Sequence, residues 1–295
     1  MTSIVIPAHN EGRVIGRLLD ALLADTSATG PDIVVVCNGC TDDTARVAGE
    51  RGDRVRVVEV PTPSKHHALR VGDEHARGFP RLYVDADVVV GAADVRALVG
   101  VLDRSPELLA VAPGRDIPLA GCAWPVRAYY RVWQRLPAVR EGLFGRGVIA
   151  VTEPGHARIA ALPPLMADDL AASLAFGPGE RLVVEEARVV VRPPRTWSDL
   201  IRRRVRAATS SAEYERFRAL RQAEAPEQQP GPEQAERTAR TGTADLRALL
   251  RARPALLPGV VVFVVAALAA RRGSRKAIRD QDFSTWLRDE SSRQG

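Results

Sequence analysis

Two pairs of aspartates have the clearest potential for chemistry in this sequence. Asp85 and Asp87 stand one residue apart directly after the apolar run 82–84, and Asp168 and Asp169 begin a stretch with a helical pattern. Two carboxylates at a strand end can hold Mg²⁺ or Mn²⁺ together with the phosphate oxygens of a substrate. A further carboxylate can act as a general base. Solvated turn residues and a helix N-cap are the structural alternatives for the two pairs.

These carboxylates need elements that bring them to one edge of a sheet. Short β-branched runs alternate with helix-period segments in the first half of the chain, with runs at 4–6, 33–36, 55–60 and 82–84 and helical patterns at 13–23 and 43–50. This alternation predicts an α/β fold with a mostly parallel sheet and helices on its faces. Ligands of such sheets bind beyond the carboxyl ends of the strands, where Asp85 and Asp87 are expected.

The second half of the chain has a looser pattern. We expect a helix at 168–174, strands at 182–184 and 187–191, and an Arg-rich helix over 197–221 after Pro193-Pro194. Residues 223–243 are rich in Pro, Glu and Gln and poor in apolar side chains, which is typical of a linker. The predicted organisation is therefore a domain over 1–222, a linker over 223–243 and a basic helical segment over 244–295.

Composition and charge narrow the class of protein. The chain has 295 residues, 45% hydrophobic and 26% charged, which argues against collagen-like, fully disordered and multi-span membrane proteins. Residues 1–191 carry a net charge of −3 and residues 192–295 one of +9. Any anionic partner therefore belongs to the C-terminal third. Three cysteines and a predicted strand near residue 3 indicate a reducing compartment and no signal peptide, so we expect a cytoplasmic protein.

One apolar run, 255–270, has basic residues on both sides. Its sixteen residues are short for a membrane-spanning helix, and Pro258-Gly259 is expected to shorten the helix further. We therefore prefer a helix that packs on the domain or lies at a membrane interface. The spacing of Cys37 and Cys40 and the pair His66-His67 could indicate metal or redox chemistry, but a loop and an exposed helix are the preferred interpretations.

Five segments in order resemble the motifs of family 2 glycosyltransferases, which are inverting, sugar-nucleotide-dependent enzymes with the GT-A fold. They are Ile-Val-Ile-Pro-Ala-His-Asn-Glu at 4–11, Val-Val-Cys-Asn-Gly-Cys-Thr-Asp-Asp-Thr at 35–44, Lys-His-His-Ala-Leu-Arg-Val-Gly at 65–72, Asp-Ala-Asp at 85–87 and Ala-Asp-Asp-Leu at 167–170. The resemblance covers roughly residues 3–210. It implies a GT-A catalytic domain with a mixed, mostly parallel sheet, flanking helices and a C-terminal helical appendage.

The resemblance also implies roles for individual residues. Asp87 would hold the metal with Asp85 nearer the ribose, Asp169 would be the general base, and Asp168 would orient it. The expected contacts to the nucleotide and its diphosphate are Pro7, Ala8, His9, Asn10, Glu11, Asn38, Lys65, Asp85, Arg204 and Arg206. Asn38 stands where the family usually has an aspartate that accepts a hydrogen bond from the base, which weakens the case for a UDP-linked donor.

The expected reaction is transfer of a single sugar from a UDP-, GDP- or dTDP-sugar to an acceptor hydroxyl, with Mn²⁺ or Mg²⁺. The acceptor is a glycan, a lipid-linked compound or a small molecule. The Gln-x-x-Arg-Trp motif of processive members is absent near Arg203, which argues against a polymer synthase. We expect no nucleic-acid partner and a peripheral position on the inner face of a membrane. The alternatives are an α/β phosphatase or nucleotidyltransferase using Asp85 and Asp87, or a non-catalytic module that binds a membrane surface.

Overall fold

The core of the protein is an eight-stranded sheet. The computed structural model describes residues 1–25, 30–166, 168–224 and 242–279. The strands lie in the order β3-β2-β1-β4-β7-β6-β8-β5, and β7 and β5 run against the other six. Their bounds are β1 Ser3–Ala8, β2 Asp32–Asn38, β3 Arg56–Val60, β4 Arg81–Val84, β5 Val89–Val90, β6 Ala110–Asp116, β7 Val148–Val151 and β8 Arg181–Val190. The predicted α/β fold with a mixed, mostly parallel sheet is confirmed.

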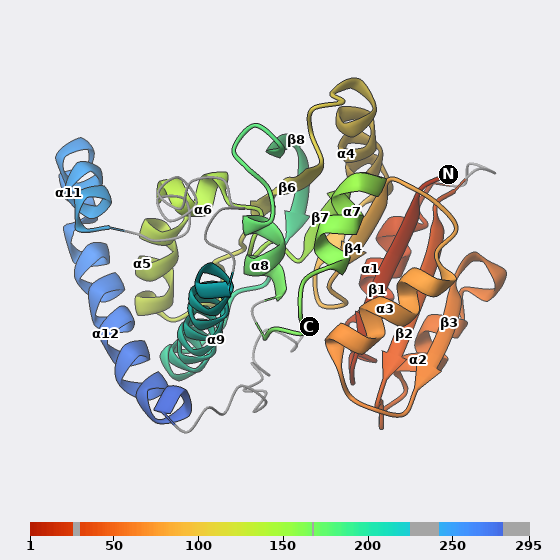
Figure 1. Cartoon of the computed structure of the whole chain (residues 1–295). Helices are drawn as coiled ribbons and strands as arrows, with labels where there is room; N and C mark the ends of the chain where they lie inside the picture. Colours follow the sequence, from red (N-terminus) through yellow and green to blue (C-terminus); the bar gives the residue numbers. More distant parts are fainter. Residues whose placement is uncertain (26–29, 167, 225–241, 280–295) are drawn as a thin grey trace.

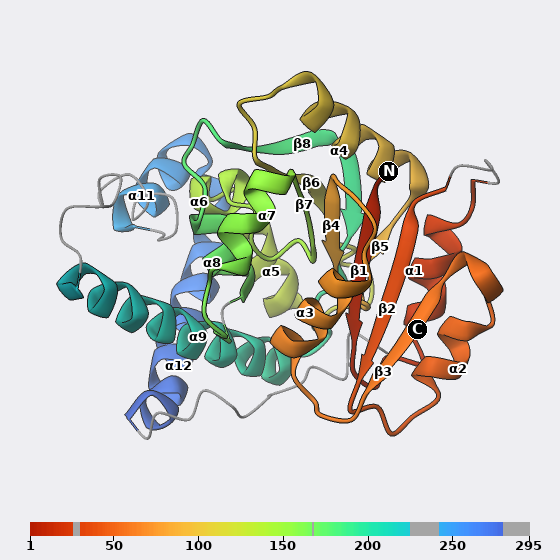
Figure 2. The same ribbon diagram turned by 45° about the vertical axis from the view of Figure 1, so that its right-hand side comes forward.

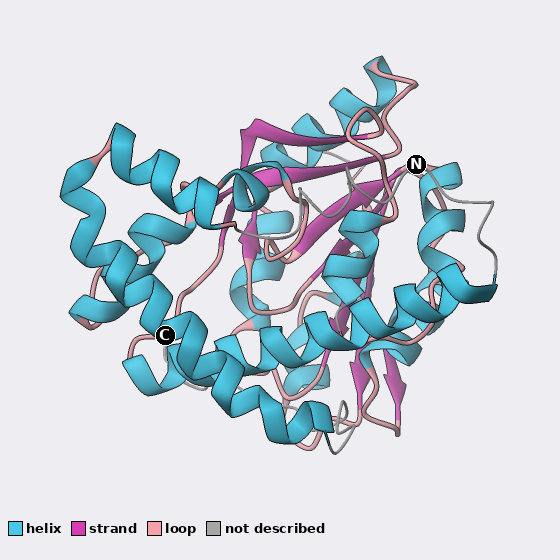
Figure 3. Ribbon diagram, turned by 60° about the vertical axis from the view of Figure 1, so that its left-hand side comes forward, coloured by secondary structure: helices cyan, strands magenta, loops and turns pink. Residues whose placement is uncertain are grey.

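Helices cover both faces of this sheet (Figure 3). Side chains of α1 (Ile15–Leu22), α2 (Thr44–Gly49) and α4 (Ala92–Arg104) pack in one large cluster on the first face. On the second face α3 (Lys65–His75) covers β2, while α7 (Glu153–Ala160) lies near β7. The remaining helices are α5 Trp124–Trp133, α6 Pro137–Glu141, α8 Asp168–Leu174, α9 Trp197–Glu224, α11 Thr243–Ala252 and α12 Leu257–Arg279, and the short turns are η1 Gly52–Arg54 and η2 Pro254–Leu256.

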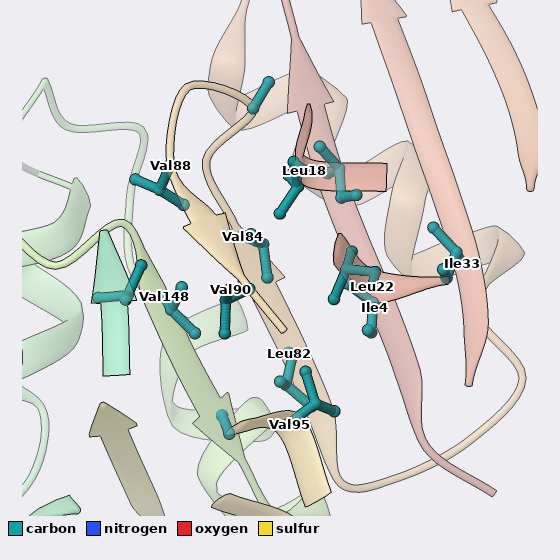
Figure 4. Close-up of a cluster of buried hydrophobic side chains, with 14 of the residues drawn as sticks. Ile4, Leu18, Leu22, Ile33, Leu82, Val84, Val88, Val90, Val95 and Val148 are labelled. Carbon is teal, nitrogen blue, oxygen red and sulfur yellow. The ribbon is translucent and has the colours of Figure 1, made fainter. Parts of the chain in front are cut away.

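The apolar runs form the strands because both faces of the central strands are buried. Every residue of β1 and β2 is buried. The helix α1 presents Ile15, Leu18, Leu19 and Leu22 to the same core, where Figure 4 shows Leu22 beside Ile4 of β1. Burying an aliphatic side chain of this size contributes about 1.5–3 kcal/mol, so this cluster fixes the central strands in place.

The order of the strands creates a switch point between β1 and β4. The chain runs outward from β1 to β2 and β3 and then returns to β4 on the other side of β1 (Figure 2). Because these four strands are parallel, their carboxyl ends at Ala8, Asn38 and Val84 lie along one edge. Ligands of open α/β sheets bind in the crevice at such a point.

Two sequence-based expectations need correction. The strands expected at 182–184 and 187–191 are one strand, β8. Its pairing with β6 shifts register between Pro113 and Gly114, so residues 185–187 form a bulge and the strand continues. The helix α12 begins at Leu257 and is not shortened by Pro258, since proline is tolerated in the first turn of a helix. A Cβ on Gly259 would lie 3.1 Å from the carbonyl oxygen of Ala128, so this glycine allows α12 to pack closely on α5.

The C-terminal helices pack on the side of the domain away from α1–α3 (Figure 1). Val260, Phe263 and Ala266 of α12 join residues of α5 and α9 in a separate hydrophobic cluster, in which the rings of Phe263 and Tyr129 stack at 5.2 Å. The linker expected over 223–243 lies almost wholly outside the described residues.

Candidate active site

The loops after β1 and β2 are tied together by polar side chains at the carboxyl edge. Asn38 is buried; its amide Nδ2 donates to the carbonyl of Ala8 at 2.8 Å, and its Oδ1 accepts from the backbone N–H of Ser64 at 3.1 Å. His9 Nδ1 lies 2.5 Å from the carbonyl oxygen of Asn38. The predicted nucleotide residues Pro7, Ala8, His9 and Asn38 therefore meet at one place.

Asn10 and Glu11 make further hydrogen bonds between the loops after β1 and β2. Asn10 adopts a left-handed backbone conformation with φ of 53°, which asparagine tolerates better than most residues, and its Oδ1 accepts from the N–H of Thr41 at 2.7 Å. The N–H of Glu11 donates to Thr44 Oγ1 at 2.8 Å, and its carbonyl accepts from the N–H of Ile15 where α1 begins. Both residues shape the edge of the site.

Lys65 joins carboxylates from two distant segments. It is the first residue of α3, which Ser64 caps by accepting a hydrogen bond from the N–H of His67 at 3.2 Å. The Lys65 Nζ lies 2.8 Å from Asp85 Oδ1 at the end of β4 and 2.7 Å from Asp168 Oδ2 in the first turn of α8. Sequence reasoning placed each of these residues in the site, and the structure brings the three together.

The charges of this triplet are strongly linked. Burial disfavours the Lys65 ammonium, but Asp168 and Asp85 outweigh it and raise the pKa of Lys65 well above its ordinary value. Burial likewise opposes ionisation of Asp85, yet Lys65 and the more distant Arg206 lower the pKa of Asp85. Burial raises the pKa of Asp168, and Asp169 and Asp85 add to that rise. Of the two carboxylates that contact Lys65, Asp168 is therefore the one whose pKa is raised.

Asp169 is held by the loop before β7. Its Oδ2 accepts from the N–H of Gly145 at 2.9 Å, and its Oδ1 accepts from the N–H of Leu170 at 2.7 Å. Asp168 and Asp169 lie in the first turn of α8, as the sequence predicted. The side chain of Asp169 is exposed at the surface of the site, which leaves it accessible to a substrate hydroxyl.

Arginines of α9 face the carboxylates. Burial and the neighbouring Arg203 lower the pKa of Arg206, while Asp87, Asp169 and Asp85 act in the opposite direction, so Arg206 lies in the field of all three carboxylates. The predicted residues Asp87 and Arg206 thus belong to the same site.

Arg203, which the sequence analysis did not place in the site, lies near Asp85, while the predicted Arg204 contacts the Tyr129 ring. The guanidinium of Arg204 lies 6.0 Å from the Tyr129 ring of α5, on a different side of α9 from Arg206. Arg203 instead lowers the pKa of Asp85 together with Arg206. Sequence reasoning missed Arg203, although helical spacing could have found it, because residues three apart share a helix face and residues two apart do not.

Arg17 and Arg115 are two further cations near the site that the sequence did not single out. Burial and Arg192 lower the pKa of Arg17 on α1, and Asp87 opposes that shift. Burial lowers the pKa of Arg115 to about 8, and Asp169 opposes that shift; its guanidinium lies 4.7 Å from the Trp133 ring and donates to the carbonyl of Gly145 at 3.3 Å.

A cavity of about 320 Å³ opens from these carboxylates toward α7. Lys65, Asp85, Asp168 and Asp169 line one end of it. Apolar side chains of β7, α7 and the loop after α7 line much of the rest, together with the polar residues His66, Arg70, Asp73, Glu74, Tyr83 and His156. Its volume is within the range of small-molecule sites.

The cysteine and histidine motifs lie on separate elements, with Cys37 in β2, Cys40 in the loop after it and the histidines in α3. Within the described part of the chain, no three His, Cys, Asp or Glu side chains are grouped as a ready-made metal centre. Cys37 is buried, and burial raises the pKa of its thiol to about 12, so it is an unreactive core residue. His66 and His67 lie in α3, as the preferred interpretation held.

The fold is an α/β sheet with charged side chains gathered at its switch point, and the sequence comparisons identify its family. The model of glycosyl transferase family 2 matches residues 3–152, about half of the chain. The chain therefore belongs to glycosyl transferase family 2. Of the three functional classes that the sequence left open, glycosyl transfer is the one supported.

Two curated relatives match parts of the chain. An uncharacterised glycosyltransferase of Mycobacterium tuberculosis is 37% identical over 123 residues, which are 42% of this chain and 52% of that protein. The 4,4'-diaponeurosporenoate glycosyltransferase of Staphylococcus aureus is 36% identical over 118 residues, 38% of this chain and 31% of that protein. The chain thus spans about half the length of the first relative and about a third of the second.

One solved structure matches nearly the whole chain. It is a mannosyltransferase of Pyrobaculum calidifontis in complex with GDP-mannose and Mn²⁺, with a TM-score of 0.65 and 20% identity over 92% of this chain and 86% of that one. At this identity the likeness concerns the fold. The match extends beyond the family segment into the C-terminal helices.

Proposed function

We propose that the chain is a metal-dependent, inverting glycosyltransferase that moves one sugar from a nucleoside-diphosphate sugar to an acceptor hydroxyl. The observation that carries the proposal is the meeting of Lys65, Asp85 and Asp168 at the carboxyl edge of the switch point. Carboxylates from two separate segments and a cation converge where an α/β sheet binds its ligand.

The donor would lie along the carboxyl edge from β2 to β4. In this assignment the nucleoside contacts Pro7, Ala8 and His9, and hydrogen bonds join Ala8 and His9 to Asn38. Asn38 already has protein partners at both ends of its amide, so any contact to the base would use the second lone pair of its oxygen.

The diphosphate would lie among the cations. Arg206 and Arg203 of α9 are close enough to Asp85 to lower its pKa, and Lys65 contacts Asp85 directly. Guanidinium groups bind phosphate oxygens through paired hydrogen bonds, so this cluster suits a leaving group that gains negative charge. Arg203 takes the place that the sequence gave to Arg204.

The donor set fits a divalent cation that the diphosphate completes. Asp87 and Asp85 offer carboxylate oxygens, and the described residues hold no larger ligand cluster. Mg²⁺ and Mn²⁺ suit such a site because they are often held by one or two carboxylates plus substrate phosphates. When bound, the cation would neutralise charge on the leaving diphosphate. The related fold that holds GDP-mannose and Mn²⁺ supports this assignment.

The transfer step would use Asp169 as general base. The carboxylate accepts the proton of the acceptor hydroxyl. At the same time the hydroxyl oxygen forms the bond to the anomeric carbon and the nucleoside diphosphate leaves. The N–H of Gly145 orients Asp169, and Lys65 orients the neighbouring Asp168. Attack from the face opposite the leaving group inverts the configuration of the sugar.

The surface of α12 supports a peripheral membrane position. The helix Pro254–Arg275 is long and apolar enough to span a bilayer, but one face of it is packed on α5 and α9. Its outer face exposes five large apolar side chains: Leu257, Val261, Val264, Val265 and Leu268. Exposed arginines lie at both ends: Arg251, Arg253, Arg271, Arg272 and Arg275. An apolar stripe between cationic ends matches an anionic lipid surface.

A thermal-shift screen tests the proposed reaction. The protein is heated with UDP, GDP, dTDP and the corresponding sugar nucleotides, each with Mn²⁺, with Mg²⁺ and with EDTA. We expect one base to raise the melting temperature in a metal-dependent way, because a ligand that binds only the folded state stabilises it. A chain that no nucleotide stabilises in the presence of either metal would contradict the proposal.

A further inference from the structure

The cavity beside the catalytic carboxylates has a polar end and a long apolar body. Its polar end is formed by Lys65, Asp85, Asp168 and Asp169. The sheet contributes Tyr83 of β4 and its cross-strand partner Ile149 of β7, and both side chains are only partly covered by protein. The far wall consists of half-buried apolar residues of α3, α7 and the loop after α7: Leu69, Ile159, Leu162, Pro163 and Leu165.

The polar groups between the sheet and α7 already bind one another. Asp73 accepts from Tyr83 Oη at 2.8 Å and from the guanidinium of Arg81 at 2.9 Å, and its second oxygen lies 3.2 Å from His156 Nε2. The other polar residues of the lining, His66, Arg70 and Glu74, all belong to α3. The opposite wall at Ile149, Ile159, Leu162 and Leu165 is apolar. A glycan packed against that wall would bury hydroxyl groups without hydrogen-bond partners, which costs free energy for each group.

We propose that this cavity binds the hydrocarbon body of the acceptor, so that the acceptor is an alcohol with an apolar chain. The inference rests on the proposed function and assigns its acceptor class. The hydroxyl lies at Asp169 and the chain extends between the sheet and α7, in contact with Ile149 and Ile159. The hydroxyl oxygen bonds to the anomeric carbon, its proton passes to Asp169, and the nucleoside diphosphate leaves with the electrons of the broken C–O bond.

The apolar walls predict a dependence on chain length. Each methylene that leaves water for an apolar cavity tightens binding about fourfold, provided that the cavity has room for it. Unbranched primary alkanols of increasing length are therefore suitable probes. Binding is measured by calorimetry with the full chain, in the presence of the nucleoside diphosphate and metal that stabilise it, so that the probe competes with no donor sugar.

Substitutions that fill the cavity separate this site from nonspecific binding. Leu162→Trp and Ile159→Trp place an indole in the space that the chain would occupy, and we expect each to weaken alkanol binding at least tenfold. Leu182→Trp is the matched control, because Leu182 is an aliphatic residue of β8 that is 45% exposed and lies outside this cavity. We expect the control to bind alkanols as the wild type does.

The experiment distinguishes a wrong acceptor assignment from a wrong proposed function. Affinity that rises with alkanol length and is lost in Leu162→Trp and Ile159→Trp supports the proposal. Affinity that does not change with length, or that survives both substitutions, overturns it even when nucleotide and metal bind. A protein that binds no nucleotide with metal refutes the proposed function itself. Melting temperatures of the variants show whether they fold, and if Ile159→Trp unfolds, the loop variant Leu162→Trp decides.

Discussion

The ammonium of Lys65 lies 2.7 Å from a carboxylate oxygen of Asp168, and the same nitrogen lies 2.8 Å from Asp85. One cation therefore holds the end of β4 and the first turn of α8 together. Without it, two partly buried carboxylates would face each other, and like charges at short range raise each other's pKa. Lys65 thus occupies the position of a counter-cation between a proposed metal ligand and the neighbour of the proposed base.

Replacement of Lys65 tests this role directly. In Lys65→Met we expect Mn²⁺ to bind the nucleotide-free protein about tenfold more tightly, because the ammonium no longer competes for Asp85 and Asp168. A tenfold change corresponds to about 1.4 kcal/mol. The affinity is measured by calorimetric titration at neutral pH. Arg46→Met, which removes an exposed cation of α2, serves as the control. Weaker or unchanged Mn²⁺ binding in Lys65→Met would show that Lys65 does not compete with the metal.

The sequence predicts the strands and the strand-end residues well because burial leaves a local pattern. The runs 4–6 and 33–36 are apolar on both faces, and their ends place Ala8 and Asn38 at the carboxyl edge. The position of Asp85 and Asp87 follows from the same rule, whereas the roles proposed for Asp168 and Asp169 come from the resemblance to the family motifs. The strands depend on neighbours in sequence, so periodicity is sufficient to find them.

Features that depend on packing between distant segments are harder to predict. The ion pair of Lys65 with Asp168 requires the exact approach of α3 and α8, which no local pattern encodes. The choice between Arg203 and Arg204 depends on the rotation of α9 about its axis. The cavity arises where side chains from several elements, among them α3, β4, β7, α7 and α8, fail to fill the space between them, so only the assembled structure reveals it.

Asp87 is expected to be essential for metal-dependent binding. In Asp87→Ala the stabilisation by nucleoside diphosphate with Mn²⁺ should fall to the value measured with EDTA, because one of the two carboxylate ligands is lost. Differential scanning fluorimetry gives this comparison, and sugar-nucleotide turnover should vanish in the same variant. Asp103→Ala, an exposed aspartate of α4, is the control. Full Mn²⁺ dependence in Asp87→Ala would assign the metal to other residues.

Asp169→Asn should separate binding from transfer. The amide oxygen can still accept from the N–H of Gly145, although the hydrogen bond from the Leu170 N–H is lost, and the side chain can no longer take a proton. We expect nucleotide affinity within about twofold of the wild type and a kcat reduced by at least about 100-fold, the usual range for loss of a general base. Steady-state kinetics and calorimetry on the same preparation measure both quantities. Turnover close to wild type would place the base elsewhere.

Asp32 makes the stability of the sheet dependent on pH. Although burial opposes its ionisation, hydrogen bonds from the Arg77 N–H, Ser3 and Arg56 lower the pKa of Asp32. A lowered native pKa contributes stability above the unfolded value of about 3.9 that is lost as the pH falls through the native value. Asp32→Asn should therefore cost about 1–3 kcal/mol at pH 7. Urea unfolding at pH 7 and pH 3 should show the difference from wild type shrinking in acid, whereas a constant difference would exclude this linkage.

The outer face of α12 gives the last prediction, which concerns the membrane. Val261 and Leu268 are 56% and 58% exposed and lie on the side of the helix away from α5 and α9. The double variant Val261→Asp, Leu268→Asp should weaken binding to vesicles with anionic lipids at least tenfold, because it removes apolar contact and adds negative charge. Leu220→Asp is a matched control, since Leu220 of α9 is also 58% exposed but lies outside the stripe. Co-sedimentation with anionic and with neutral vesicles measures the effect. Equal sedimentation of the double variant, the control and the wild type would exclude α12 as the membrane-binding face.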